Sequence, residues 1–391
     1  MNTKLIFTFI LINFVLVGGC RKMEPEKAEI KLRLLLEKTV TKNQDLHHGI
    51  LLVHSDSLNI HWKFASGIVG KEQKPITADH TFHIASIGKT ITSALIGKLY
   101  EEGKISYDDP IKKYLSDDIL KDLHIYEGKS YSDKILVRHL LNHTSGIADY
   151  FEEQPKKGKS ILELALDEPD RFWAPVETIQ WVKNNLEAHF PPSEGFYYGD
   201  TGYQLLGLII EKITGKPMHE SLHEYIFDPL NMNHSYQLFY SEPVEKSPYP
   251  ISDIYIDQEE VSTYQSLSID WAGGGVISNT EDLLLFHQAL VNNTLLKAET
   301  FNEWKDWAKF GKGIDYGYGL VSLIFKEMLF FLSDKLNMWG NWGSTSTYMF
   351  YNPAYDIYII GAFNQSNFVK KQVRFMIKII SIVSKLSKTD V

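Results

Sequence analysis

The sequence predicts an α+β fold in which one antiparallel β-sheet is flanked by N- and C-terminal helices and carries an inserted all-helical domain. Three observations predict it. Apolar runs typical of strands occur over 48–65 and return over 316–363, and helix-type spacing fills the middle of the chain. Two amphipathic segments, 28–42 and 368–386, stand at the ends. The first and last segments are therefore expected to build the sheet together.

The domain boundaries follow from where this pattern changes. We predict one folded domain over 28–391, with the sheet part roughly at 28–95 and 268–391 and the helical part roughly at 96–267. With 44% hydrophobic residues, the chain can fill one large core or two interleaved ones. A catalytic cleft is expected where the two parts meet.

The first 95 residues of this domain predict a helix, a hairpin and a second helix. Charges interspersed with apolar residues predict a helix over 28–42, and apolar runs at 48–53 and 59–65 predict a β-hairpin. Apolar residues at three- and four-residue spacing then predict a helix that begins at Ser86, and Gly103 suits its left-handed end.

The middle of the chain has helical patterns punctuated by glycine and proline. We expect a helix over 136–141, two pieces within 160–190 broken at Pro169 and Pro175, and a strongly apolar helix after Tyr203 that Gly215 ends.

The last third returns to strands. Asn279 or Thr280 is expected to cap a helix, because Glu281 and Asp282 fill its first turn. The strand-like segments that follow are 316–325, 327–332, 346–351 and 356–363. The final helix, 368–386, is too charged to span a membrane.

The N-terminus indicates export. Lys4 precedes an apolar run that is too short for a spanning helix, and small residues lead to Cys20, the single cysteine. This resembles the lipobox of bacterial lipoproteins, in which the cysteine is acylated. We predict a signal peptide over 1–19, a lipidated tether over 20–27, and anchoring to a bacterial membrane on its periplasmic or cell-surface side. An ordinary secretory signal is the alternative.

Charge and cysteine content exclude other classes. The net charge is -9 and no basic block occurs, which excludes nucleic acid as an expected partner. One cysteine allows no disulfide within the chain, so stability must come from packing.

The only Ser-x-x-Lys of the chain lies at Ser86 and Lys89. If Ser86 opens a helix, Lys89 lies about 60° round the axis and about 4.5 Å along it, so hydroxyl and amine can meet. A serine is a weak nucleophile until a base takes its proton, and a lysine can do so only if its pKa is lowered. For an isolated motif, an exposed helix start is the commoner explanation.

Five ordered blocks change that balance. They are the Ser86 helix start, LLNHTSG at 140–146, the Tyr198 segment, AGGG at 272–275 and GNWGS at 340–344. Together they resemble the serine β-lactamase and penicillin-binding superfamily, in its class C, D-alanyl-D-alanine carboxypeptidase and esterase branch. The resemblance runs from about residue 28 to the end.

The resemblance implies roles. Ser86 matches the nucleophile, Lys89 its proton-handling partner and Tyr198 the general base or proton relay, whose phenolate Lys89 would favour. The backbone N–H groups of Ser86 and Ser344, the latter on the strand edge after Gly343, would form the oxyanion hole. A bulky residue at 343 would crowd the substrate. The family needs no cofactor or metal.

Two positions depart from the family pattern. Asp200 stands where Asn is common, and Asn341 replaces the Lys or His of the strand motif. Both changes make the cleft less positive, and a substrate carboxylate would lose a contact often worth about 1.5–3 kcal/mol. We therefore expect action on neutral esters or on D-amino-acid amides, whose ammonium could approach Asp200, rather than efficient β-lactamase action. The expected partner is a small molecule or peptide, such as a peptidoglycan fragment.

Two alternatives stay open. The segment 219–223 fits His-Glu-x-x-His, a zinc-protease motif, although no third ligand follows at helical spacing. The second alternative is a catalytically silent member of the family that senses wall fragments or assists assembly, since a fold does not guarantee chemistry. His83 and His143 are expected to make structural hydrogen bonds.

Overall fold

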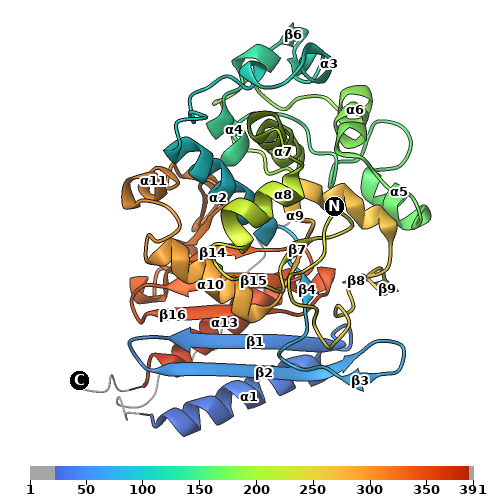
Figure 1. The fold of residues 1–391 in the computed structure, drawn as a ribbon. Coiled ribbons are helices and arrows are strands. Elements are labelled where there is room, and N and C mark those ends of the chain that lie inside the picture. The colour runs from blue at the N-terminus through green and yellow to red at the C-terminus, as the bar shows by residue number, and fades with distance from the viewer. Residues whose placement is uncertain (1–22, 387–391) are drawn as a thin grey trace.

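The first and last segments of the chain pair in one antiparallel sheet. The computed structural model describes residues 23–386. The nine strands of the main sheet follow the order β11-β12-β13-β14-β15-β16-β1-β2-β3 (Figure 1). They are β1 (His48–Ser55), β2 (Ile60–Val69), β3 (Lys74–Pro75), β11 (Ala308–Gly311), β12 (Ile314–Tyr316), β13 (Val321–Leu323), β14 (Met338–Trp342), β15 (Thr347–Asn352) and β16 (Ile357–Ala362). The predicted fold class is confirmed.

Both faces of this sheet are covered. In β1, Leu51 and Val53 belong to one apolar cluster and Ile50 and Leu52 to another, because successive side chains point to opposite faces. The first cluster includes residues of the two terminal helices, and the second includes the helices of the middle of the chain. The flanking helices are α1 (Pro25–Lys42), α2 (Ile87–Glu101), α10 (Thr280–Val291), α11 (Ala298–Glu303) and α13 (Val369–Val383).

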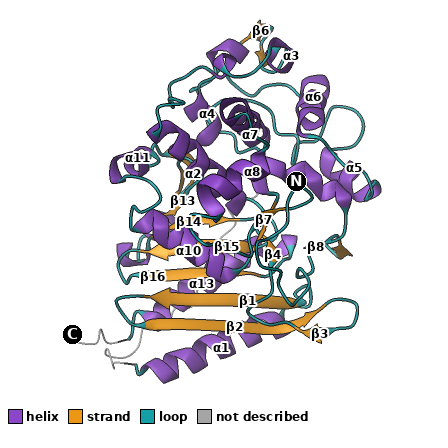
Figure 2. Ribbon diagram, viewed as in Figure 1, coloured by secondary structure: helices purple, strands orange, loops and turns teal. Residues whose placement is uncertain are grey.

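The helical part stands on one side of the sheet (Figure 2). Its α-helices are α3 (Asp117–Leu120), α4 (Val137–Leu141), α5 (Ile161–Asp167), α6 (Pro175–Asn185), α7 (Thr201–Thr214), α8 (Met218–Leu222) and α9 (Trp271–Gly274). Short strands β4 (Phe82–His83), β7 (Tyr236–Gln237) and β10 (Val276–Ser278) form a three-stranded sheet, and β5 (Ile125–Tyr126) and β8 (Tyr255–Ile256) pair with β6 (Lys129–Ser130) and β9 (Glu259–Glu260). Within 23–386, no helix is both long and apolar enough to cross a bilayer.

The segment 316–332 differs from the prediction of two strands. It forms the hairpin β12–β13, turned at Gly319 with a φ of 68°, and then the short helix α12 (Phe325–Met328). The reason is pairing: β13 has β14 as its second neighbour, with Leu323 opposite Met338, so no ladder position remains for 327–332.

The N-terminal predictions are only partly open to comparison. The signal peptide over 1–19 and Cys20 lie outside the described residues. The tether predicted to end at 27 is too long, because α1 already begins at Pro25, where proline suits the first helical turn.

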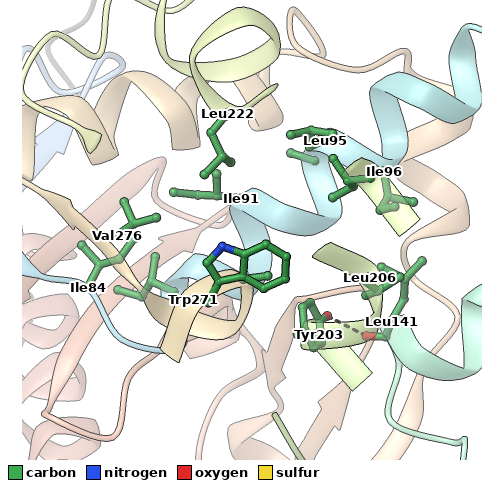
Figure 3. Packing of buried hydrophobic residues seen from close by; sticks show 14 of the residues in the cluster. Ile84, Ile91, Leu95, Ile96, Leu141, Tyr203, Leu206, Leu222, Trp271 and Val276 are labelled. Carbon is green, nitrogen blue, oxygen red and sulfur yellow. Dashed lines mark hydrogen bonds between the residues drawn. The ribbon is translucent and has the colours of Figure 1, made fainter. Parts of the chain in front are cut away.

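Helix α2 is the buried centre of the helical part. Ile91 and Leu95 pack with Trp271 of α9 and Leu206 of α7 (Figure 3). Glycines allow this approach: a Cβ on Gly88 would lie 2.9 Å from the backbone of Gly274. The start of α2 is therefore held directly against α9.

Gly88→Ala should destabilise the protein. The new methyl meets backbone, so we expect the free energy of unfolding to fall by about 1–3 kcal/mol. Gly202→Ala in α7 is the matched control, since its Cβ meets nothing closer than 3.4 Å. Helix propensity should make this control neutral or up to about 1 kcal/mol more stable. Urea unfolding of both variants decides; equal losses would contradict the close contact.

Candidate active site

Ser86 lies at a sharp turn between β4 and α2. The preceding Ala85 has a φ of 48°, unusual for a residue with a side chain, and its N–H donates to His83 Nδ1 at 3.2 Å. Burial lowers the pKa of His83 to about 4, so this ring is a neutral acceptor. The turn leaves Ser86 half-buried as the N-cap residue of α2, with its hydroxyl at the helix start.

Lys89 lies one turn along and is fully buried, with 0% of its surface exposed. Its Nζ donates to Ser86 Oγ at 3.1 Å and to the Gly273 carbonyl at 3.3 Å, and it forms an ion pair with Asp200. The structure thus brings the predicted serine and lysine together. It adds the glycine-rich segment before β10 as a third support for the ammonium.

The charge state of Lys89 differs from the expectation. Burial lowers its pKa, but the neighbouring Asp200 and Tyr198 raise it, and the net result lies above the usual value. Lys89 is therefore an ammonium at neutral pH. The lowered pKa that Lys89 would need to act as a base is therefore not found in the free protein, and the reason is the contact of this amine with Asp200.

Tyr198 lies beside Lys89. Its ring centroid lies 5.2 Å from Lys89 Nζ, and the ring packs between His143, at 4.4 Å, and Phe310, stacked at 5.7 Å. Burial raises the pKa of Tyr198, and although Lys89 and Ser86 lower it, burial prevails. Tyr198 is a neutral phenol in the free protein, not the phenolate that its position beside Lys89 led us to expect.

Asp200 belongs to Lys89 rather than to an open cleft. It is 5% exposed, and its backbone N–H donates to Asp149 Oδ1 at 2.8 Å. Burial, followed by the charge of Asp200, raises the pKa of Asp149 to about 8 and that of Asp270 to about 7. A direct approach of a substrate ammonium to Asp200 does not fit this placement.

Asn341 is turned away from the substrate side. It is buried, and its Nδ2 donates to the carbonyls of Ser86 and Gly319, at 3.0 and 3.1 Å, and to Thr90 Oγ1 at 3.1 Å. Its Oδ1 accepts from the N–H of Trp342. These contacts do not support the predicted substrate-binding role, because the side chain ties β14 to the first turn of α2 and so positions Ser86.

Gly343 and Ser344 follow β14. A Cβ on Gly343 would lie 2.3 Å from Thr347 Oγ1 and 2.6 Å from Ala85 Cβ, so a larger residue would displace the turn before Ser86 rather than crowd the substrate directly. Ser344 is exposed in a turn, not on a strand edge, because β14 ends at Trp342. Within 23–386 the N–H groups of Ser86 and Ser344 have no assigned acceptor, and their oxyanion role stays a prediction.

The sequence missed several residues at the site. Phe310 lies far from the motifs along the chain. Asp149 and Asp270 lie close to the blocks 140–146 and 272–275, but no spacing rule links them to Ser86. His143 makes the expected structural bond, accepting at Nδ1 from the Gly199 N–H at 3.3 Å. Its positive φ of 59° brings the ring under Tyr198.

The two histidines of the His-Glu-x-x-His segment, 219–223, have separate partners. The helix changes to a π-helix at His223, which pairs with Asp228 at 3.1 Å, while His219 lies beside Tyr240. In the part of the chain that the structure describes, no three His, Cys, Asp or Glu side chains gather as a metal site.

Comparisons with known proteins agree on one family. The model of the beta-lactamase family matches residues 57–376. Penicillin-binding protein 4* of Bacillus subtilis (strain 168) is 26% identical over 312 residues, 73% of this chain and 62% of that protein. The human mitochondrial serine beta-lactamase-like protein LACTB is 27% identical over 59% of this chain and 51% of its own. The chain thus spans about half to three fifths of these relatives.

Solved structures show the same fold. A D-stereospecific amidohydrolase from Streptomyces sp. is 25% identical with a TM-score of 0.71, over 86% of this chain and 94% of that one. The D-amino acid amidase of Ochrobactrum anthropi SV3, 22% identical with a TM-score of 0.72 over 90% and 98%, supports the fold alone.

Asn341→Asp should destabilise the site. The substitution replaces a donor shared by two carbonyls with a buried acceptor, and we expect a loss of about 3 kcal/mol in the free energy of unfolding. Asn292→Asp, on an exposed helix end, should change stability by less than about 0.5 kcal/mol. Thermal unfolding compares them. An Asn341→Asp variant as stable as the control would show that the inward orientation is wrong.

Proposed function

The chain belongs to the beta-lactamase family, and from that premise we propose that it is a serine hydrolase that cleaves an uncharged ester or a D-amino-acid amide through an acyl-enzyme on Ser86. The observation that carries the proposal is the contact of Ser86 Oγ with Lys89 Nζ at 3.1 Å beside the ring of Tyr198. The solved structure named as a D-stereospecific amidohydrolase supports the amide class.

The reaction would begin at Ser86. Its Oγ bonds to the substrate carbonyl carbon while its proton passes either to deprotonated Lys89 or, relayed by the Lys89 ammonium, to Tyr198 in its phenolate form. The N–H groups of Ser86 and Ser344 receive the developing oxyanion. The carbon–nitrogen or carbon–oxygen bond then breaks, and the leaving group takes up the proton that Ser86 lost. Water repeats the sequence to release the acid.

The surroundings favour a neutral, apolar substrate. Lys89 forms an ion pair with Asp200, which cancels the positive charge beside Ser86. Tyr198 and Phe310, whose rings stack at 5.7 Å, are each half-buried and so keep part of their aromatic surface exposed. Such a wall suits an apolar or aromatic group and offers a carboxylate no charged partner.

We propose further that the protein acts outside the cytoplasm, anchored through a lipid on Cys20. The lipobox-like run before this cysteine supports the anchor, and the penicillin-binding relatives support the location. A catalytically silent sensor of wall fragments is the second candidate. The specific observation in its favour is that neither Lys89 nor Tyr198 is a base at neutral pH.

Ser86→Ala should abolish labelling by a fluorophosphonate and hydrolysis of a p-nitrophenyl ester. Ser130→Ala, at an exposed strand residue, should retain both. The parent protein should prefer a neutral ester to its carboxylate-bearing analogue by about tenfold or more in kcat/KM. Labelling that survives Ser86→Ala would reassign the nucleophile, and preference for the anionic ester would reject the proposed substrate class. A parent protein without turnover would favour the silent member.

The rate should rise into the alkaline range. Both groups that can take the Ser86 proton have raised pKa values, so kcat/KM should increase from neutral pH upward. Asp200→Asn removes the charge that raises the pKa of Lys89 and leaves burial to lower it. The rise should then move to lower pH, with a gain of about tenfold at neutral pH per unit moved.

Asp200→Glu is the control for this profile, because it keeps the charge. It should keep the alkaline rise of the parent, whereas a profile with its midpoint near pH 6.5 in every variant would point to a histidine base instead.

A further inference from the structure

Helices α1 and α13 form one outer layer on the sheet. They run antiparallel: the Met23 N–H, just before α1, donates to the Lys385 carbonyl at 2.9 Å, and Lys371 Nζ, at the start of α13, donates to Asn43 Oδ1 at 2.9 Å. Figure 1 shows both helices beside the strands β1, β2 and β16, away from the helical part. The layer therefore joins the two ends of the described chain.

The exposed side of α13 is basic. Every fully exposed residue of this helix is a lysine or arginine, and the helix has no acidic residue: Lys370, Lys371, Arg374 and Lys378. Three of them repeat every fourth residue and so share one face. Within 23–386 none of the four forms an ion pair, which leaves their charge uncompensated.

This charge is unusual for the chain. Helix α1 adds five basic and three acidic residues, so the layer is positive in a protein with a net charge of -9. On its outward side α1 also exposes two apolar residues one turn apart, Ile30 at 56% and Leu34 at 54%. Lys27 and Lys31 are exposed beside them, as are Glu26 and Glu37. Basic residues around exposed apolar ones are the pattern of a surface that lies on a membrane.

We propose that the α1–α13 layer docks on an anionic lipid bilayer. Cys20, the proposed acylation site, precedes Met23 by three residues, and the Met23–Lys385 bond fixes that end of the chain beside the end of α13. A lipid on Cys20 would hold this layer next to headgroups. Each lysine or arginine close to an anionic surface strengthens binding about fivefold.

Docking would orient the catalytic half. The apolar cluster under α1 and α13 lies on one face of the sheet, and the cluster that contains α2, the helix that begins after Ser86, lies on the other. The layer on the bilayer therefore directs the helical part away from it. Substrates would reach Ser86 from the aqueous side.

The test uses the full chain with Cys20→Ser, so that no acyl chain holds it. Co-sedimentation with phosphatidylcholine vesicles, with and without phosphatidylglycerol, is measured at low and high salt. Lys370→Glu/Arg374→Glu/Lys378→Glu should bind the anionic vesicles on the order of 100-fold more weakly. Lys121→Glu/Lys134→Glu/Lys157→Glu, an equal charge change at exposed residues of the helical part, should bind within about threefold of the parent.

Ile30→Ser/Leu34→Ser should weaken vesicle binding without changing its salt dependence. Because this variant alters no charge, it tests the apolar contribution separately from the basic face. Circular dichroism and ester hydrolysis establish folding, and they are separate from the vesicle readout. Equal weakening by both triple variants, or binding indifferent to phosphatidylglycerol, would overturn the proposal. Binding of a soluble polyanion through the basic face of α13, together with no binding to vesicles, would also overturn it.

Discussion

The buried ion pair between Lys89 and Asp200 is the constraint on which the site depends. A lysine with no exposed surface is costly unless a charge and hydrogen bonds compensate it. Here the compensation comes from Asp200 at the start of α7 and from the carbonyl of Gly273 in α9. The helices α2, α7 and α9 must therefore converge on one amine. The same convergence places Lys89 within hydrogen-bonding distance of Ser86.

Glycines and an asparagine make that convergence possible. The start of α2 approaches α9 so closely that Gly88 has no space for a methyl group, and Gly343 passes just as closely behind Ala85. Asn341 then binds the carbonyl of Ser86 from the sheet side. Ser86 is thus held from α9, from β14 and from its own helix, as the proposed attack in one geometry would require.

The sequence predicted the fold and the proximity of Ser86, Lys89 and Tyr198, because these rest on strand alternation, helical spacing and short motifs in order. It did not predict orientation. Whether Asn341 faces the cleft or α2 depends on Gly319, whose carbonyl faces Asn341 only because the hairpin β12–β13 turns there. The sequence pattern predicted one long strand where this hairpin lies. Periodicity does not show where a strand turns back, or which strand pairs with its second edge. Charge states were missed for the same reason: they depend on contacts, not on residue type.

The two departures from the family pattern are therefore of different kinds. Asn341 donates to two carbonyls and one hydroxyl in a buried space, where a lysine would bring a second charge within the first turn of α2 without an acid beside it. Its neutrality is required by packing and says little about the substrate. Asp200 alone changes the chemistry, because it cancels the charge of Lys89 and holds that amine protonated. A site altered in this way loses attraction for anions and gains a dependence on alkaline pH through one carboxylate, so charge preference and pH optimum should change together whenever residue 200 changes.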